Sequence, residues 1–81
     1  MTIEVLFFAQ LREQLGTERT SLEVPPGFKV QDVMRRLQAH PEWQSAARLP
    51  LTYAVNEHIV DNDHPLRDGD RLALLTPVSG G

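Results

Sequence analysis

The end of the chain carries its most distinctive chemistry, because the last two residues are Gly80 and Gly81. Glycine has no Cβ, so a diglycine end is the thinnest peptide available and can enter a channel in which any side chain would clash. From Pro77 to Gly81 an extended chain reaches about 17 Å at most. The pattern predicts a C-terminal tail, residues 78–81, that holds out a carboxylate to the active site of another protein. A frayed terminus is the plain alternative.

The polar residues elsewhere in the chain do not form a recognisable catalytic or metal-binding motif. The histidines are not spaced as metal ligands, and no serine lies in a nucleophile elbow. No glycine-rich loop opens a helix after a strand, and the clustered aspartates lack the spacing of a calcium loop and are better explained by turn chemistry. The residues concerned are His40, His58 and His64; Ser21, Ser45 and Ser79; and Asp61, Asp63, Asp68 and Asp70. The sequence therefore predicts no metal site and no tightly bound cofactor.

Composition narrows the class of protein further. The chain has 81 residues, eight Lys+Arg against eleven Asp+Glu, a net charge of -3 and no cysteine. This length allows one small domain, and the missing cysteine excludes disulfides, thiol nucleophiles and cysteine-bound metals. The acidic balance argues against nucleic-acid binding. No apolar run approaches the ~18–20 residues of a membrane span, and no signal peptide is evident, so we expect a cytoplasmic domain without membrane contact.

Hydrophobic periodicity predicts one long helix and several strands that position the tail. Over residues 30–39, apolar side chains recur at the spacing of an amphipathic helix that lies on a sheet. Gly16 is placed to end a short helix at residues 10–15, and Pro25 and Pro26 stop a strand. Strands are predicted at residues 1–9, 20–24, 51–56, 59–60 and 71–75, turns at residues 56–58 and 67–70, and a further helical turn or two within residues 42–49.

This order of elements predicts an α+β fold of the ubiquitin-like β-grasp type, with a mixed sheet of about five strands packed on one main helix. The first two strands should be antiparallel, and the last strand should lie beside the first in parallel. We expect the β-grasp domain to span residues 1–77 and the diglycine tail to span residues 78–81.

The sheet has more apolar residues than one buried face needs. If Phe7 faces the helix, then Phe8 faces away from it, and Leu75 likewise lies opposite Leu74. Ile59 sits beside a turn, where a solvated residue is expected. Each could be ordinary packing taken alone, but a contiguous apolar patch on a small protein indicates a partner surface.

Three segments carry a resemblance that covers essentially the whole chain. They are Phe7–Glu13 (FFAQLRE), Asp63–Asp70 (DHPLRDGD) and Pro77–Gly81 (PVSGG), with Ala54–Asn56 (AVN) as a further match. In this order they resemble the MoaD-type small subunit of molybdopterin synthase, one of the ubiquitin-like sulfur carriers. The sibling carrier of thiazole synthesis shares the fold and the diglycine end, but usually lacks the first two segments. The family often has aromatic residues where this chain has Leu74 and Leu75.

The resemblance implies a role in molybdenum cofactor biosynthesis. An ATP-dependent enzyme would adenylate Gly81, and a desulfurase or rhodanese-like donor would supply sulfur to form a thiocarboxylate, with Gly80 giving clearance. The tail would then deliver sulfur to cyclic pyranopterin monophosphate in the active site of the large subunit, and two carriers would dock on a dimer of large subunits. The residues implied to bind the partner are Phe8, Ile59, Leu75, Pro77, Val78 and Ser79.

Two other functions share the same tail chemistry. One is a sulfur carrier for thiamine synthesis or tRNA thiolation. The other is a ubiquitin-like modifier whose Gly81 forms isopeptide bonds with lysines. All three begin with adenylation of Gly81, so adenylation alone does not separate them.

Overall fold

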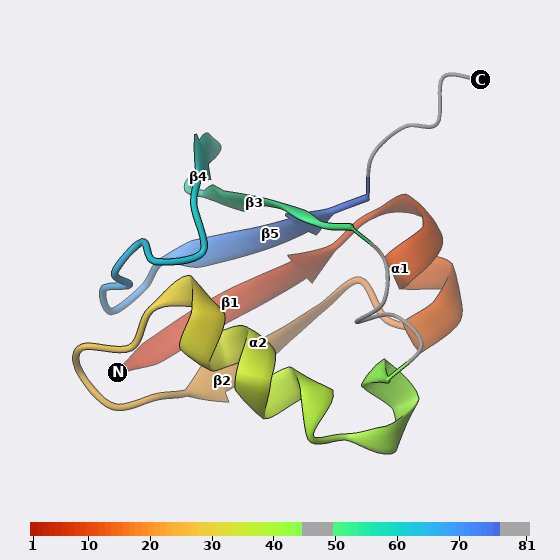
Figure 1. Ribbon diagram of the computed structural model, residues 1–81, viewed down its shortest axis with the longest axis horizontal. Coiled ribbons are helices and arrows are strands. Elements are labelled where there is room, and N and C mark those ends of the chain that lie inside the picture. Colours follow the sequence, from red (N-terminus) through yellow and green to blue (C-terminus); the bar gives the residue numbers. More distant parts are fainter. Residues whose placement is uncertain (45–49, 77–81) are drawn as a thin grey trace.

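A mixed five-stranded sheet is the frame of the structure, a computed structural model that describes residues 1–44 and 50–76 (Figure 1). The strand order is β2-β1-β5-β3-β4, and the central pair β1·β5 is parallel while the other pairs are antiparallel. The strands are β1 (Thr2–Phe7), β2 (Arg19–Glu23), β3 (Thr52–Val55), β4 (His58–Val60) and β5 (Arg71–Leu75). The helices are α1 (Ala9–Leu15) and α2 (Val30–Gln38). The predicted α+β, β-grasp architecture is confirmed.

Most predicted boundaries differ from the structure by one or two residues: the strands predicted at residues 20–24 and 51–56 span Arg19–Glu23 and Thr52–Val55, and the helices predicted at residues 10–15 and 30–39 span Ala9–Leu15 and Val30–Gln38. Two further differences have a clear physical cause. The first strand ends at Phe7 rather than Ala9, because Phe8 keeps an extended backbone as the N-cap of α1 and Ala9 already belongs to that helix. The turn between β3 and β4 is two residues long, not three. Asn56 and Glu57 have φ of 50° and 74°, and two consecutive positive φ values are what a tight two-residue hairpin requires. His58 therefore starts β4 instead of lying in a loop.

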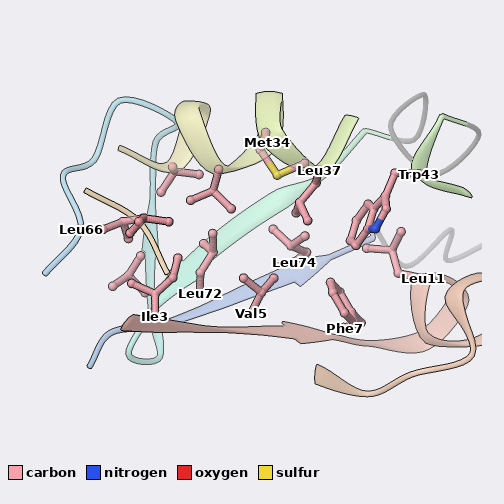
Figure 2. Close-up of a cluster of buried hydrophobic side chains, with 14 residues drawn as sticks. Ile3, Val5, Phe7, Leu11, Met34, Leu37, Trp43, Leu66, Leu72 and Leu74 are labelled. Atoms are coloured by element: carbon pink, nitrogen blue, oxygen red, sulfur yellow. The ribbon is translucent and has the colours of Figure 1, made fainter. Parts of the chain in front are cut away.

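One face of the sheet packs against α2 and forms the core (Figure 2). Alternate residues of β1 and β5 turn toward the helix, and the helix contributes the four apolar residues that its periodicity predicted. The helix residues are Val30, Val33, Met34 and Leu37, and the strand residues facing them include Ile3, Val5, Phe7, Leu72 and Leu74. Burial of these side chains supplies most of the stability of so small a domain.

The N-terminus of α2 is held by the loop that follows β4. The first two helical N–H groups, of Val30 and Gln31, donate to the carbonyls of His64 and Asn62 at 3.1 and 2.7 Å. An Asp32 carboxylate oxygen accepts the N–H of Lys29 at 2.9 Å. Each bond satisfies a donor that a helix end otherwise leaves unpaired.

Trp43 lies in a short 3₁₀ turn, Pro41–Trp43, rather than in a longer helix. Its ring packs edge-on against Phe7 with centroids 5.0 Å apart and an interplanar angle of 61°, which is a favoured aromatic geometry. The prediction of a helical turn or two within residues 42–49 is confirmed for this short turn, and residues 45–49 lie outside the described residues.

Neighbouring leucines on β5 provide a test of the two-faced sheet. Leu74 is fully buried among the core side chains, whereas Leu75 faces the other way and is half-buried. Leu74→Ala should lower the free energy of unfolding by about 2–5 kcal/mol through lost burial and a cavity. Leu75→Ala, the matched control, should cost clearly less. Urea denaturation followed by circular dichroism measures both, and equal losses would contradict the assignment of faces.

Candidate docking site on the outer face of the sheet

An apolar row crosses the outer face of the sheet, by which we mean the face turned away from α2. Side chains of residues paired in register lie on the same face, so the pairing defines the row. One residue comes from each of four adjacent strands: Leu6 pairs with Ala73, Ala73 with Ala54, and Ala54 with Ile59. The row ends at Ile59, whose side chain is 68% exposed.

Phe8 and Leu75 lie side by side at one end of this face. Phe7 pairs with Leu74 in the parallel β1·β5 ladder, so the next residues along the two strands, Phe8 and Leu75, are neighbours. Because Phe8 has an extended backbone, the alternation of side chains between the two faces of β1 continues through it, and its ring points to the face opposite that of Phe7. Phe8 is 43% exposed, and the sequence-based expectation that it faces away from the core is confirmed.

A hollow of about 350 Å³ joins the row to Phe8. Its apolar lining comes from β1, the N-cap of α1 and β5, and its polar rim comes from the β3–β4 turn and the start of β5. The lining residues are Leu6, Phe8 and Ala73, and the rim residues are Asn56, Glu57 and Arg71. An apolar floor with a charged rim is the usual composition of a protein–protein contact surface.

The rim is rigidly positioned because Asn56 ties the β3–β4 turn to β5. Its Oδ1 accepts the N–H of Arg71 at 3.0 Å, its Nδ2 donates to Asp70 at 2.9 Å, and its backbone N–H donates to the Arg71 carbonyl at 2.9 Å. The Asp70 carboxylate also accepts the N–H of Arg67 at 2.7 Å. Three bonds from one residue therefore hold Glu57 against the edge of the hollow.

Apolar and polar side chains lie at opposite ends of the outer face, measured along the strands. Its apolar residues gather toward the end of β5, whereas the opposite end carries Thr2 and the register pair Glu4 and Arg71, which have opposite charges. Ser21 extends this polar end onto β2. A partner that buries the apolar part of this face must therefore sit over the end at which β5 finishes.

The predicted site residues divide into two groups. Phe8, Leu75 and Ile59 all lie on the outer face, although Ile59 is two strands away from Leu75. The tail residues Pro77, Val78, Ser79, Gly80 and Gly81, and with them the predicted boundary between domain and tail, lie outside the described residues. Which of these residues contact a partner remains a prediction.

Sequence reasoning missed the middle of the surface. Ala54 and Ala73 are small, and nothing in their types indicates an interface, but their register makes the row continuous. Side-chain alternation along β5 could have identified Ala73. It is two residues from Leu75, so both side chains lie on the same face of the sheet, and the sequence had already indicated Leu75.

The described residues, 1–44 and 50–76, hold no cluster of three potential metal ligands, and none of the helices among them is long and apolar enough to cross a membrane. Nothing in the described surface offers a catalytic constellation.

Solved structures place the fold in the ubiquitin-like β-grasp class. SAMP1, a small archaeal modifier protein from Haloferax volcanii, superimposes with a TM-score of 0.85 at 29% identity, with all of both chains covered. A chain from the complex of subunits 1 and 2 of molybdopterin-converting factor from Helicobacter pylori superimposes with a TM-score of 0.76 at 29% identity, again over both whole chains.

Sequence comparison then defines the family. The model of the ThiS family matches residues 5–81, and the chain belongs to that family. The molybdopterin synthase sulfur carrier subunit of Escherichia coli is 44% identical over 98% of this chain and 99% of its own length. The resemblance to ubiquitin-like sulfur carriers predicted from three short segments is confirmed.

Asn56 gives a test of how the rim is held. Asn56→Ala removes both side-chain hydrogen bonds and places a Cβ-bearing aliphatic residue at φ 50°, so the free energy of unfolding should fall by about 1–3 kcal/mol. Asn56→Gly removes the same bonds but tolerates the backbone conformation, so it should lose less. Denaturant unfolding of the two variants separates the contributions, and unchanged stability in both would contradict the anchoring role.

Proposed function

We propose that this chain is the sulfur carrier subunit of a molybdopterin synthase, in which Gly81 carries sulfur and the outer face docks on the large subunit. One observation carries the proposal: the apolar outer face converges on Phe8 and Leu75, where β5 ends and the chain runs on toward Gly81. The 44% identity to the sulfur carrier subunit of E. coli molybdopterin synthase supports the choice of pathway.

Activation begins at the carboxylate of Gly81. A carboxylate is a poor electrophile, so we propose that its oxygen attacks the α-phosphorus of ATP on an adenylating enzyme, forming an acyl-adenylate and releasing pyrophosphate. The terminal sulfur of a persulfide on a desulfurase or rhodanese-like donor then attacks the acyl carbon, and the C–S bond forms as the C–O bond to AMP breaks and AMP leaves. A second thiol of the donor system attacks the donor sulfur of the resulting acyl disulfide, so that a disulfide remains on the donor system and the C-terminal sulfur is released as an anion. The product is a thiocarboxylate, which is anionic near neutral pH and nucleophilic.

Delivery needs a partner that supplies the pocket. This chain holds out the thiocarboxylate, and the large subunit binds cyclic pyranopterin monophosphate and supplies the acids and bases. From Leu75, the six remaining residues reach about 20 Å when extended, which is enough to enter a neighbouring active site. Gly80 and Gly81 would pass through a channel too narrow for side chains.

Docking would bury the outer face. The H. pylori structure with the same fold is a complex of both subunits of molybdopterin-converting factor, and that likeness favours an equivalent pairing here. In this proposal Phe8 and Ile59 are anchor residues that fill partner pockets, and Glu57 and Arg71 form the charged rim. Pro77, Val78 and Ser79 would lie along the entrance of the partner channel.

Intact mass spectrometry of the protein purified from its native host tests the chemistry. The expected result is a mass increase equal to one sulfur replacing one oxygen, localised to Gly81, and loss of that species when Gly81 is deleted. The thiocarboxylated protein mixed with its matched large subunit and precursor should yield molybdopterin. A matched pair that forms none would overturn the pathway, while an unmodified Gly81 would overturn the carrier role itself.

Phe8→Ala tests the docking face separately from the fold. Because the ring is 43% exposed, its removal should change the free energy of unfolding by less than about 1 kcal/mol, yet weaken binding to the large subunit by at least about tenfold. Isothermal titration calorimetry measures binding, and denaturant unfolding measures stability. Glu13→Ala, on the exposed side of α1, is the control and should alter neither. A loss of stability larger than the loss of binding would show that Phe8 is a core residue.

Protein modification is the second candidate function, and the likeness to a small archaeal modifier protein favours it. In that case Gly81 would form an isopeptide bond with a lysine of another protein. Lysine-linked adducts bearing the C-terminal peptide of this chain would support it. Their absence from host extracts that contain thiocarboxylated protein would favour the carrier.

A further inference from the structure

At the edge of β2 that does not pair with β1, the backbone N–H and C=O groups of alternate residues point away from the described sheet. β2 is the outermost strand on its side of the described sheet. Phe7 donates to the carbonyl of Glu18 and Val24 donates to that of Met1, so these residues form hydrogen-bonded pairs with β1, and such pairs recur every second residue. The intervening residues turn their N–H and C=O groups away from the sheet. They are Arg19, Ser21 and Glu23.

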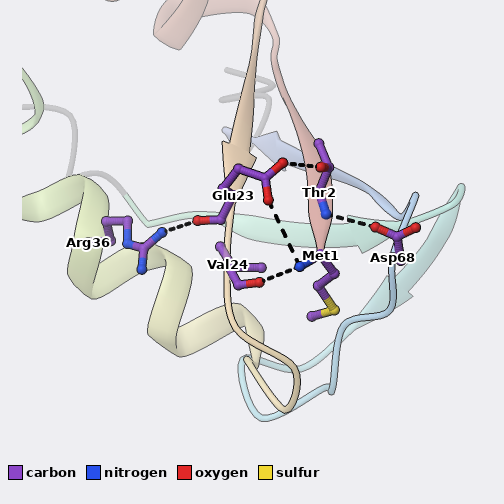
Figure 3. Close-up of polar contacts among 6 residues, drawn as sticks. All are labelled: Met1, Thr2, Glu23, Val24, Arg36 and Asp68. Carbon is purple, nitrogen blue, oxygen red and sulfur yellow. Dashed lines mark hydrogen bonds and ion pairs between the residues drawn. The ribbon is translucent and has the colours of Figure 1, made fainter.

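Side chains occupy the two outer carbonyls of this edge. Thr17 Oγ1 donates to the Arg19 carbonyl at 3.1 Å. Arg36 Nη1, reaching from α2, donates to the Glu23 carbonyl at 2.5 Å, as Figure 3 shows. Among the described residues, Ser21 between them has no such side-chain donor. Proteins commonly shield sheet edges in this way, because unpaired strands template pairing with another chain.

The same three residues are self-complementary in charge. Arg19 is positive, Ser21 neutral and Glu23 negative, and all three side chains lie on the outer face and are exposed. If a second copy pairs antiparallel about a two-fold axis at Ser21, then Arg19 lies opposite Glu23 of that copy, and the reciprocal pair forms by symmetry. Two-fold registers centred on Arg19 or Glu23 instead place like charges opposite each other, which is unfavourable.

The helix side of the edge fits the same register. There, Leu22 of one copy comes opposite Thr20 of the other, and both residues line a hollow of about 260 Å³. Its floor includes Leu37 and Trp43. Leu22 is only half-buried in the single chain, so its pairing at this rim removes further apolar surface from water.

We propose that the β2 edge is a self-association surface, which binds a second copy of this chain in antiparallel register centred on Ser21. Arg36 limits the strength of this association, because it occupies the Glu23 carbonyl that the Arg19 N–H of the second copy must reach. The pairing joins two sheets edge to edge and leaves the outer face of each copy open over β1, β5, β3 and β4.

A cysteine at the axis tests the register directly. The natural chain has no cysteine, so Ser21→Cys introduces its only thiol. Residues opposite each other in a hydrogen-bonded antiparallel pair have Cα atoms about 5.5 Å apart, within the range of a disulfide. Under mild oxidation Ser21→Cys should form a covalent dimer at least about tenfold faster than Glu13→Cys, an exposed control on α1. Equal rates would overturn the proposal.

Charge reversal provides a second measurement. In sedimentation velocity over a concentration series, Arg36→Ala should lower the dimer dissociation constant by about tenfold. Arg19→Glu should raise it by at least about tenfold, and Arg19→Glu with Glu23→Arg should restore it, since the reciprocal pairs are re-formed. Arg12→Glu, the same charge change on α1, should have no effect.

Glu23 also contacts Thr2 and the N-terminal amine, so circular dichroism must first show that each variant is folded. Native and Arg36→Ala proteins that both stay monomeric at the highest soluble concentration would overturn the proposal. So would an association that Arg19→Glu leaves unchanged.

Discussion

The parallel pairing of β1 with β5 is the constraint on which the rest of the structure depends. It joins the first strand of the chain to the last described one at the centre of the sheet. Parallel neighbours need a crossover connection, and α2 with the segments around it provides that crossover and covers one face. Because the two strands run in the same direction, they finish at the same end, and Phe8 and Leu75 meet there. The juxtaposition of Phe8 and Leu75 at this end of the outer face follows from this one pairing.

The two faces of the central strands have different roles, and alternation keeps them apart. Phe7 and Leu74 pack in the core, while their immediate neighbours Phe8 and Leu75 belong to the outer face. We therefore expect a substitution on the core face to act mainly on stability, and a substitution on the outer face to leave the core packing intact.

Much of the fold could be predicted because local signals agreed with the tertiary structure. The helical spacing of Val30 to Leu37, the αL position of Gly16 and the turn signal before β5 each had one interpretation. The exact end of β1 could not be predicted, because Phe8 suits a strand equally well and only the adjacent helix N-cap ends the strand there. The length of the β3–β4 turn depended on positive φ values at Asn56 and Glu57, which residue type favours only for Asn56.

The docking site was predictable only in part. The sequence did indicate Phe8 and Leu75. They are large apolar residues, and strand alternation places them on the face opposite the core. The continuity of the surface was not, because it depends on the register among four strands and on small residues such as Ala54 and Ala73. The Arg36 contact at the β2 edge was equally hidden, since Arg36 reaches the Glu23 carbonyl across 13 positions of sequence. Long-range contacts of this kind have no local pattern.

The parallel β1·β5 pair also has a mechanical consequence. Tension applied between the start of β1 and the end of β5 acts along the two strands in opposite directions, so the hydrogen bonds of the ladder are loaded in shear and must fail together. An antiparallel hairpin pulled from its open end is instead peeled apart one bond at a time. The β1·β5 ladder therefore gives the sheet its greatest resistance to a force that draws the end of β5 away from the start of β1.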